Sequence, residues 1–488
     1  MAKNRQGESM SSTADAPVTV TDQVTAENQV AGSEREPATI WASREYRAWF
    51  AGDLLQDLGA GIAMFAFPLV CLAVTGSPVH AGTVGFFQGA GTLLGILPGG
   101  VLADRHNRRA LRLVSSGLGV LAQVALVVLL LTGTANVANL AALAFLDRLR
   151  NSLLSPASNS MLKQVVPGRL LPNAVAANQG RDAAITLATG PAGGALLAIH
   201  LYVPALAQII GQLASMVATL RMRGDYRPGR REGSESATQS GGAERSCDSK
   251  RAKSAARSGD SPKSKRSGRL SPALAEFNES LRWMWNRTVV RVLLICACLL
   301  NLGWAGMMMS VTLGLASRGV APALIGLLAT ALGCGALAGA VVAAKVVARV
   351  PSGVLIVAGF LLCAGVVALV PFLPGLGWIG AMYALMGLII PAVNAAVLGL
   401  VTLMTPNELM GRVGSVSQFF SSGAAAFAPA LAGWGIGTLG WELTQSAFAL
   451  PTALAAFAML ASAQVRRIPA SPQWETYLEE TGALSARD

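Results

Sequence analysis

Between two long apolar runs, residues 81–103 and 110–132, the sequence reads Gly99-Gly100-Val101-Leu102-Ala103-Asp104-Arg105-His106-Asn107-Arg108-Arg109. Apolar runs of this length predict membrane-spanning helices, because hydrocarbon leaves every backbone polar group to be satisfied within the helix. A connection that carries a carboxylate and a cluster of arginines cannot rest in hydrocarbon. The stretch therefore predicts a short loop at a membrane surface, and its cations place that surface in the cytoplasm.

The composition of the whole chain is that of a polytopic membrane protein. Of 488 residues, 52% are hydrophobic and only 13% are charged, against about 25% charged residues in a soluble protein. The net charge of +12 is carried between and beside the apolar runs, so we interpret it as an orientation signal and predict no nucleic-acid partner. The first 40 residues are polar and lack an apolar core, so no cleavable signal peptide is predicted.

The apolar runs predict an all-α fold with about twelve transmembrane helices in two six-helix bundles. The fourth helix is expected to end at the Ser155-Pro156 break, and the twelfth to cover about residues 443–464. Cations gather in the loops on one side, which predicts that both termini are cytoplasmic. The predicted order is a disordered N-terminus (1–44), a first bundle (45–221), a flexible basic linker (222–272), an interfacial amphipathic helix (273–288), a second bundle (289–465) and a cytoplasmic tail (466–488).

The two halves of the chain resemble one another. Pro156-Ala157-Ser158-Asn159-Ser160 parallels Pro391-Ala392-Val393-Asn394-Ala395, and Pro172-Asn173-Ala174-Val175 parallels Pro406-Asn407-Glu408-Leu409. Matches in the same order indicate a duplication within the chain. Two duplicated bundles predict a substrate path between them.

The loop quoted first resembles the loop between helices two and three of major facilitator superfamily transporters, Gly-x-Leu-Ala-Asp-Arg-x-Gly-Arg-Arg. Asn107 stands where that pattern has its second Gly, and Asn also tolerates a left-handed backbone. The resemblance implies a gate that closes the cytoplasmic side through a charge contact between the bundles. The residues of this gating motif are Gly100, Asp104, Arg105, Arg108 and Arg109.

Further stretches resemble the drug-exporter branch that includes macrolide-efflux and enterobactin-exporter-like proteins. They are Leu72-Ala73-Val74-Thr75-Gly76-Ser77, Ala176-Ala177-Asn178, Gly190-Pro191 and Glu408-Leu409-Met410-Gly411-Arg412-Val413. This resemblance implies export of small molecules and does not identify the substrate.

The sequence contains no constellation of catalytic residues. Gly99 and Gly100 are followed by Val-Leu-Ala and not by Gly-Lys-Ser, so no phosphate-binding loop is predicted. The three His are isolated from one another and from Cys, so we predict no metal site, no cofactor and no enzymatic activity. The energy for transport must then come from an ion gradient or from the substrate gradient.

Carboxylates within the apolar runs are the candidates for proton coupling, because charge in hydrocarbon is costly unless it is paired or hydrated. Asp53 and Asp57 lie one turn apart on one face of the first helix, and two such carboxylates disfavour double ionisation. Asp57 is the leading candidate for binding protons or substrate. The alternative for Asp53 is a position near the headgroups, where it only supports the fold. Asp182 and Asp147 are further candidates.

Arginines within the apolar runs are candidates for a charge network. They are Arg181 in the fifth helix, and Arg148 and Arg150 in the fourth. Either arginine of the fourth helix could take the place of an arginine that the resembled family carries there. A purely structural salt-bridge network is the alternative, and pairing of Asp147 or Asp57 with Arg181 is left open.

Polar, aromatic and methionine side chains could line a substrate cavity, since Met re-packs around varied ligands. The same residues could equally hold the helices together. The cavity candidates are Gln88, Asn301, Trp304, Met308 and Gln418.

Taken together, the residues and the resemblance predict an exporter of amphipathic small molecules (an antibiotic, a siderophore or another metabolite) in the cell membrane. The predicted mechanism is proton antiport with alternating access by a monomer, with the lipid bilayer, protons and a small-molecule substrate as its partners. An importer or lipid flippase of the same fold, or a membrane sensor or scaffold that transports nothing, are the alternatives.

Overall fold

The computed structural model describes residues 39–222, 270–406, 409–474 and 476–477. The predicted N-terminal segment before residue 39, linker residues 223–269 and tail residues 478–488 lie outside the described residues.

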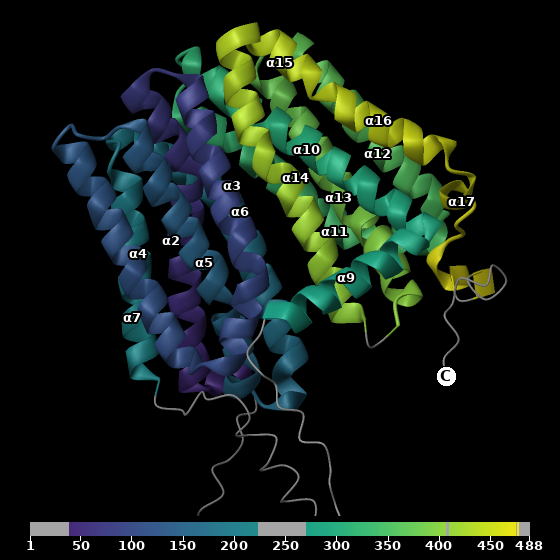
Figure 1. The fold of residues 1–488 in the computed structure, drawn as a ribbon, viewed down its shortest axis with the longest axis horizontal. Coiled ribbons are helices and arrows are strands. Elements are labelled where there is room, and N and C mark those ends of the chain that lie inside the picture. Colours follow the sequence, from purple (N-terminus) through teal and green to yellow (C-terminus); the bar gives the residue numbers. More distant parts are fainter. Residues whose placement is uncertain (1–38, 223–269, 407–408, 475, 478–488) are drawn as a thin grey trace, which may run out of the picture.

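The first bundle consists of six long helices (Figure 1). One of them, α5, continues past Ser155-Pro156 and ends at Val165, so the predicted end of the fourth helix at this break was wrong. A proline is tolerated inside a membrane helix because neighbouring helices satisfy the backbone group that it frees. The six helices are α2 (Arg44–Thr75), α3 (Pro78–Arg105), α4 (Arg108–Leu131), α5 (Val137–Val165), α6 (Leu171–Ile199) and α7 (Val203–Arg221).

The second bundle follows the amphipathic helix α9 (Leu270–Asn286). Its last span is broken at Phe448 into α15 and α16, where the sequence predicted one continuous helix. The ring of Phe448 lies against Gly306 of α10 and its backbone carbonyl lies against Gly303. Pro451 also cannot donate the helical hydrogen bond to Ala447, which favours a break at this point. The helices are α10 (Thr288–Ser317), α11 (Pro322–Arg349), α12 (Ser352–Leu369), α13 (Leu376–Met404), α14 (Met410–Leu439), α15 (Trp441–Ala447), α16 (Ala449–Ala461) and α17 (Ala463–Arg466).

Short 3-10 turns complete the described secondary structure. They are Ile40–Ala42, Gly168–Leu170, Val370–Phe372 and Ser471–Gln473.

The helices are long and apolar enough for a multi-pass membrane protein. Ten helical spans in the described part of the chain meet both criteria, one of them formed by α15 and α16 together. The other two long helices, α3 and α5, have 28 and 29 residues, and α5 carries Asp147, Arg148 and Arg150 in its middle. The predicted all-α membrane fold with two helical bundles is confirmed.

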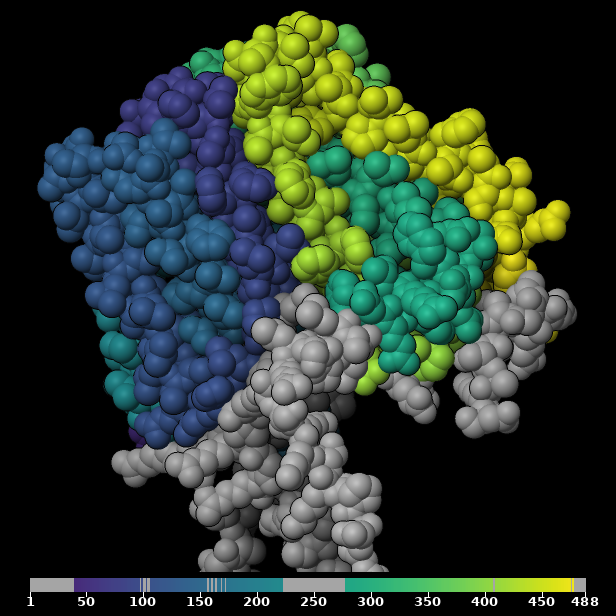
Figure 2. Space-filling view, viewed as in Figure 1, coloured from purple at the N-terminus to yellow at the C-terminus, as the bar shows by residue number. Residues whose placement is uncertain are grey.

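The two bundles meet along two seams built from close backbone contacts. In one seam the first half of α3 packs on the second half of α14, where a Cβ added to Gly433 would overlap the carbonyl oxygen of Pro78. In the other, the end of α6 packs on the start of α11, and a Cβ on Gly326 would overlap the carbonyl oxygen of Gly190. Figure 2 shows the purple α3 directly against the yellow-green α14.

Both seams lie toward one end of the molecule, which we call the closed end. The opposite end, which we call the basic end, carries the loop between α3 and α4 together with Arg221, Arg349 and Arg412 at helix termini. In Figure 1 the closed end is at the top and the basic end at the bottom. The described conformation therefore joins the bundles at the end away from the predicted gating loop.

Candidate functional site

A buried carboxylate on α2 is the centre of a charged cluster inside the first bundle. Asp53 is only 4% exposed. Its Oδ2 lies 2.6 Å from Nη1 of Arg181 on α6, and its Oδ1 lies 3.3 Å from Nη1 of Arg112 on α4. The hydroxyl of Ser158 on α5 donates a hydrogen bond of 2.6 Å to the same Oδ1. Four helices thus contribute to holding Asp53 as a paired anion, as a buried charge requires.

Arg181 is shared by three carboxylates. Besides Asp53, its guanidinium lies 2.8 Å from Oδ1 of Asp182 and 3.4 Å from Oδ2 of Asp57. The guanidinium carbon also lies 5.7 Å from the ring centroids of both Trp49 and Phe50. A planar cation between aromatic rings and several carboxylates suits arginine and not lysine, because only the guanidinium offers a fork of donors.

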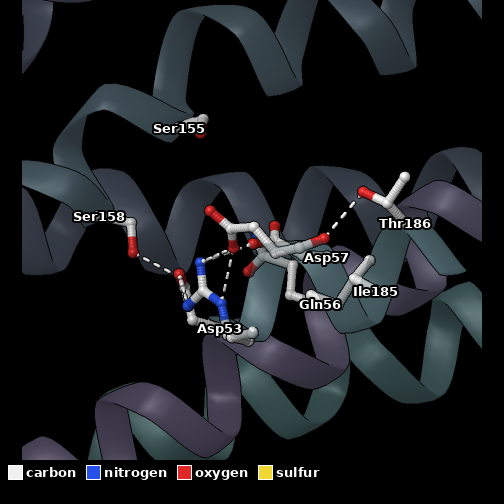
Figure 3. A pocket seen from close by; sticks show the side chains of 9 residues that line it. Asp53, Gln56, Asp57, Ser155, Ser158, Ile185 and Thr186 are labelled. Atoms are coloured by element: carbon white, nitrogen blue, oxygen red, sulfur yellow. Dashed lines mark hydrogen bonds and ion pairs between the residues drawn. The ribbon is translucent and has the colours of Figure 1, made fainter. Parts of the chain in front are cut away.

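The charged cluster forms one wall of a cavity of about 280 Å³. The side chain of Asp57 is 40% exposed and that of Asp182 is 60% exposed, whereas the side chain of Asp53 is only 5% exposed. Asp57 and Asp182 are therefore the carboxylates that a small molecule or a proton can reach. The cavity is lined by Asp53, Gln56, Asp57, Ser155, Ser158, Arg181, Asp182, Ile185 and Thr186 (Figure 3).

Asp147 lies in a second buried network, away from this cavity. Its carboxylate is 3.0 Å from Nη2 of Arg150 and 3.1 Å from Nη2 of Arg148, and it accepts a hydrogen bond of 3.3 Å from Gln208 on α7. Arg150 also donates to the backbone oxygen of Ser115 on α4, over 2.8 Å. The partners of Asp147 come from α5 and α7, whereas those of Arg181 come from α2 and α6. Within the described chain, the arrangement of Asp147 suits a structural role.

We expect Asp147→Asn to lower the free energy of unfolding by about 3 kcal/mol, because it leaves two buried guanidinium groups without their carboxylate. Chemical unfolding in detergent, followed by Trp fluorescence, measures the change. Glu442→Gln is the control: this carboxylate is 76% exposed and pairs with Arg318 at 3.9 Å, so its loss should cost less than about 1 kcal/mol. An Asp147→Asn variant as stable as the control would show that Asp147 is not held by this network.

The gating motif lies at the basic end. Gly100, Asp104 and Arg105 fall in the last turns of α3, and the side chains of Asp104 and Arg105 lie outside the described part of the structure. Arg108 and Arg109 begin α4, and Arg109 donates to the carbonyl oxygen of Leu220 at the end of α7 over 3.1 Å.

The predicted cavity residues are divided between the bundles. Asn301 and Gln418 are exposed, and their amides donate over 2.8 Å to the Ala297 carbonyl and the Ser422 hydroxyl of their own helices. Gln88 on α3 is buried. Trp304, with its ring centroid 5.7 Å from that of Tyr383, and Met308 pack against the core of the second bundle.

Sequence reasoning missed several residues that complete the site. Arg112 follows Arg108 by one helical turn and is 2% exposed, so its spacing from the gating motif was an available signal. Ser158, Gln56 and Gln208 have no such signal, because their roles depend on which helix faces them.

Two membrane-embedded helical bundles, one of which holds an accessible cluster of ionisable groups, are typical of a secondary transporter, and the protein is a transporter and not an enzyme. The chain belongs to the Major Facilitator Superfamily, whose family model matches residues 50–429 and again residues 293–484. No curated protein matches the chain in sequence.

Solved structures share this fold at low sequence identity. A POT family transporter in complex with 5-aminolevulinic acid has a TM-score of 0.64 and 12% identity, covering 87% of this chain and 97% of its own. A bacterial homologue of the iron transporter ferroportin in an inward-facing state has a TM-score of 0.62 and 14% identity, covering 85% and 98%. A bacterial homologue of the lysosomal transporter Spinster, inward-facing and unoccupied, has a TM-score of 0.55 and 15% identity, covering 91% and 99%.

Proposed function

We propose that the protein exports amphipathic small molecules across the cell membrane by proton antiport with alternating access. The observation that carries the proposal is the position of Asp57, which is half-exposed in the cavity and 3.4 Å from Arg181. The direction of export rests on the resemblance of residues 408–413 and the other quoted stretches to the drug-exporter branch. An antibiotic, a siderophore or another metabolite is the proposed substrate.

The proposed topology places the basic end and both termini in the cytoplasm, following the positive-inside rule. The two seams then lie on the outer side, so the cavity is reached from the cytoplasm in the described conformation. In the proposed opposite conformation, Asp104 and the arginines of the gating motif join the bundles at the basic end.

The proposed cycle uses Asp57 as the group that exchanges a proton. Once substrate leaves on the outer side, the Asp57 carboxylate takes a proton from outside. Arg181 keeps its short contacts to Asp53 and Asp182, at 2.6 and 2.8 Å, so the buried Asp53 stays paired whether Asp57 is protonated or ionised. The protonated carrier then turns inward, releases the proton and binds substrate again.

Asp57→Asn is expected to reduce gradient-driven transport at least tenfold while leaving the protein folded. The amide cannot exchange a proton, and the side chain is 40% exposed, so its replacement leaves Asp53, Arg112 and Arg181 paired. Proteoliposomes that contain a pH-sensitive dye measure substrate-dependent proton movement, with macrolides, siderophores and lipophilic dyes as test substrates. Transport by the natural protein that is indifferent to the pH gradient would refute proton coupling.

Import remains the second candidate, because one of the solved structures with this fold is a D-xylose-proton symporter. Symport and antiport differ in the direction of substrate movement relative to the same proton gradient. Inverted and right-side-out vesicles that carry the protein distinguish the two. Accumulation of substrate in right-side-out vesicles with an inward proton gradient would establish import.

A further inference from the structure

We infer that the cavity binds a monovalent organic cation that carries N–H donors, such as a protonated amine or a guanidinium compound. The inference rests on the proposed function only in taking the cavity as the substrate site. It narrows the proposed substrates to cationic amphipathic molecules and excludes anionic ones, including catecholate and other acidic siderophores. Charge balance, an unpaired acceptor and the composition of the second bundle support it separately.

With all three carboxylates ionised, the state that is ready to bind substrate, the charged cluster has one negative charge in excess. Three carboxylates (Asp53, Asp57 and Asp182) face two guanidinium groups (Arg112 and Arg181). Asp53 is approached by both guanidinium groups, at 2.6 and 3.3 Å, and is the least exposed of the three carboxylates. The uncompensated charge therefore lies on Asp57 and Asp182, on the accessible side, where it attracts a cation and repels an anion.

Gln56 adds a hydrogen-bond acceptor without a partner. The residue is 6% exposed and lines the cavity, and its carbonyl oxygen Oε1 has no hydrogen-bond partner. A buried polar atom without a partner is costly, so a ligand that donates to it gains affinity. Asp57 and Asp182 also offer only acceptors when ionised. A ligand with N–H donors therefore pairs with the two carboxylates, and it reaches Oε1 of Gln56, which is buried in this conformation, once that side chain turns toward the cavity.

The second bundle supplies no charge that could reverse this preference. In the described residues of α10 to α16, the side chains of Asp, Glu, Lys and Arg occur only near helix ends: Arg291, Lys345, Arg349, Arg412 and Glu442. The polar candidates Asn301 and Gln418 are uncharged amides. The cationic group of the ligand must therefore be recognised by the first bundle, which supplies all the residues that line the cavity.

Two dyes built on the same xanthene ring test the sign of the charge. Rhodamine 6G is a monovalent cation with two N–H groups, and fluorescein is an anion at neutral pH. Fluorescence anisotropy with the full chain in detergent micelles, without a pH gradient, should show rhodamine 6G binding at least tenfold more tightly than fluorescein. The double variant Asp57→Asn/Asp182→Asn should lose at least tenfold in affinity for rhodamine 6G, whereas Glu442→Gln should bind it as the natural protein does.

Thermal unfolding of each variant shows that loss of binding is not loss of fold. Equal or tighter binding of fluorescein, no binding of rhodamine 6G to the natural protein, or unchanged affinity in a folded double variant would each overturn the inference. These outcomes are independent of transport. If rhodamine 6G binding depends on the two carboxylates but the transport rate does not change with the pH gradient, proton antiport is refuted. The proposed cation site is then still supported.

Discussion

Replacing Arg181 by Gln is expected to abolish transport and to lower the free energy of unfolding by about 3 kcal/mol or more. Asp53, with its side chain 5% exposed, would lose its shortest ion pair of 2.6 Å. Breaking a buried pair on one side costs about 3–5 kcal/mol, since the remaining charge stays buried. Asp57 and Asp182 would lose the same cation, which places three poorly compensated carboxylates around one cavity.

A second substitution separates the cost of the buried charge from the role of Arg181 in the cavity. Asp53→Asn/Arg181→Gln removes the uncompensated carboxylate, so most of the stability should return while transport stays lost. Arg318→Gln is the control, because its pair with Glu442 spans 3.9 Å and its side chain is 49% exposed; we expect a change below about 1 kcal/mol. Transport by the single variant at the natural rate would contradict the assigned role of Arg181. Unfolding in detergent and uptake into proteoliposomes give the two measurements.

Gly326→Ala is expected to open the seam between α6 and α11 and to shift the population away from the described conformation. The new methyl group would overlap the carbonyl oxygen of Gly190 and lie 2.8 Å from the nitrogen of Pro191. Overpacking of this kind costs about 1–3 kcal/mol, which corresponds to a shift of roughly 5- to 150-fold between two conformations. Turnover should fall because the carrier returns to this conformation less often.

Spin labels on cysteines introduced at His200 and Arg318, in a background without the native cysteines, report the separation of the bundles at the closed end. His200 follows directly after α6, and Arg318 lies in the connection between α10 and the seam helix α11. The distance distribution should move to longer values in Gly326→Ala. Gly365→Ala is the matched control, because a Cβ there would meet nothing within 4 Å. An unchanged distribution in Gly326→Ala would mean that the seam is not a rigid contact.

Most of the fold followed from the sequence, because long apolar runs dictate membrane helices whatever surrounds them. The errors occurred where a distant residue decides the backbone. α5 runs on past Ser155-Pro156 because neighbouring helices support it. The last span breaks at Phe448, whose ring lies against Gly306 of another helix. Here the sequence did hold a local signal, because Pro451 leaves the carbonyl of Ala447 without its helical donor.

The sequence predicted which charged residues, apart from Arg112, form the candidate site. It did not predict which of these carboxylates would be buried and which would be accessible. The spacing of Asp53 and Asp57 places both on one face of α2, yet one is 5% and the other 40% exposed. That difference depends on Arg112 and Ser158, which reach Asp53 from α4 and α5. No pattern in a single sequence records which side chains from other helices converge on a residue.

Among the described membrane-spanning helices, charged side chains away from the helix ends occur only in the first bundle. The two halves of the chain can therefore accept substitutions independently of one another. A substitution on the inner face of α10 or α14 changes the shape offered to a substrate and leaves Asp53, Asp57 and Arg181 untouched. Chimeras that join this first bundle to second bundles from other transporters of the superfamily therefore offer a direct route to carriers with new selectivity and the same charged cluster.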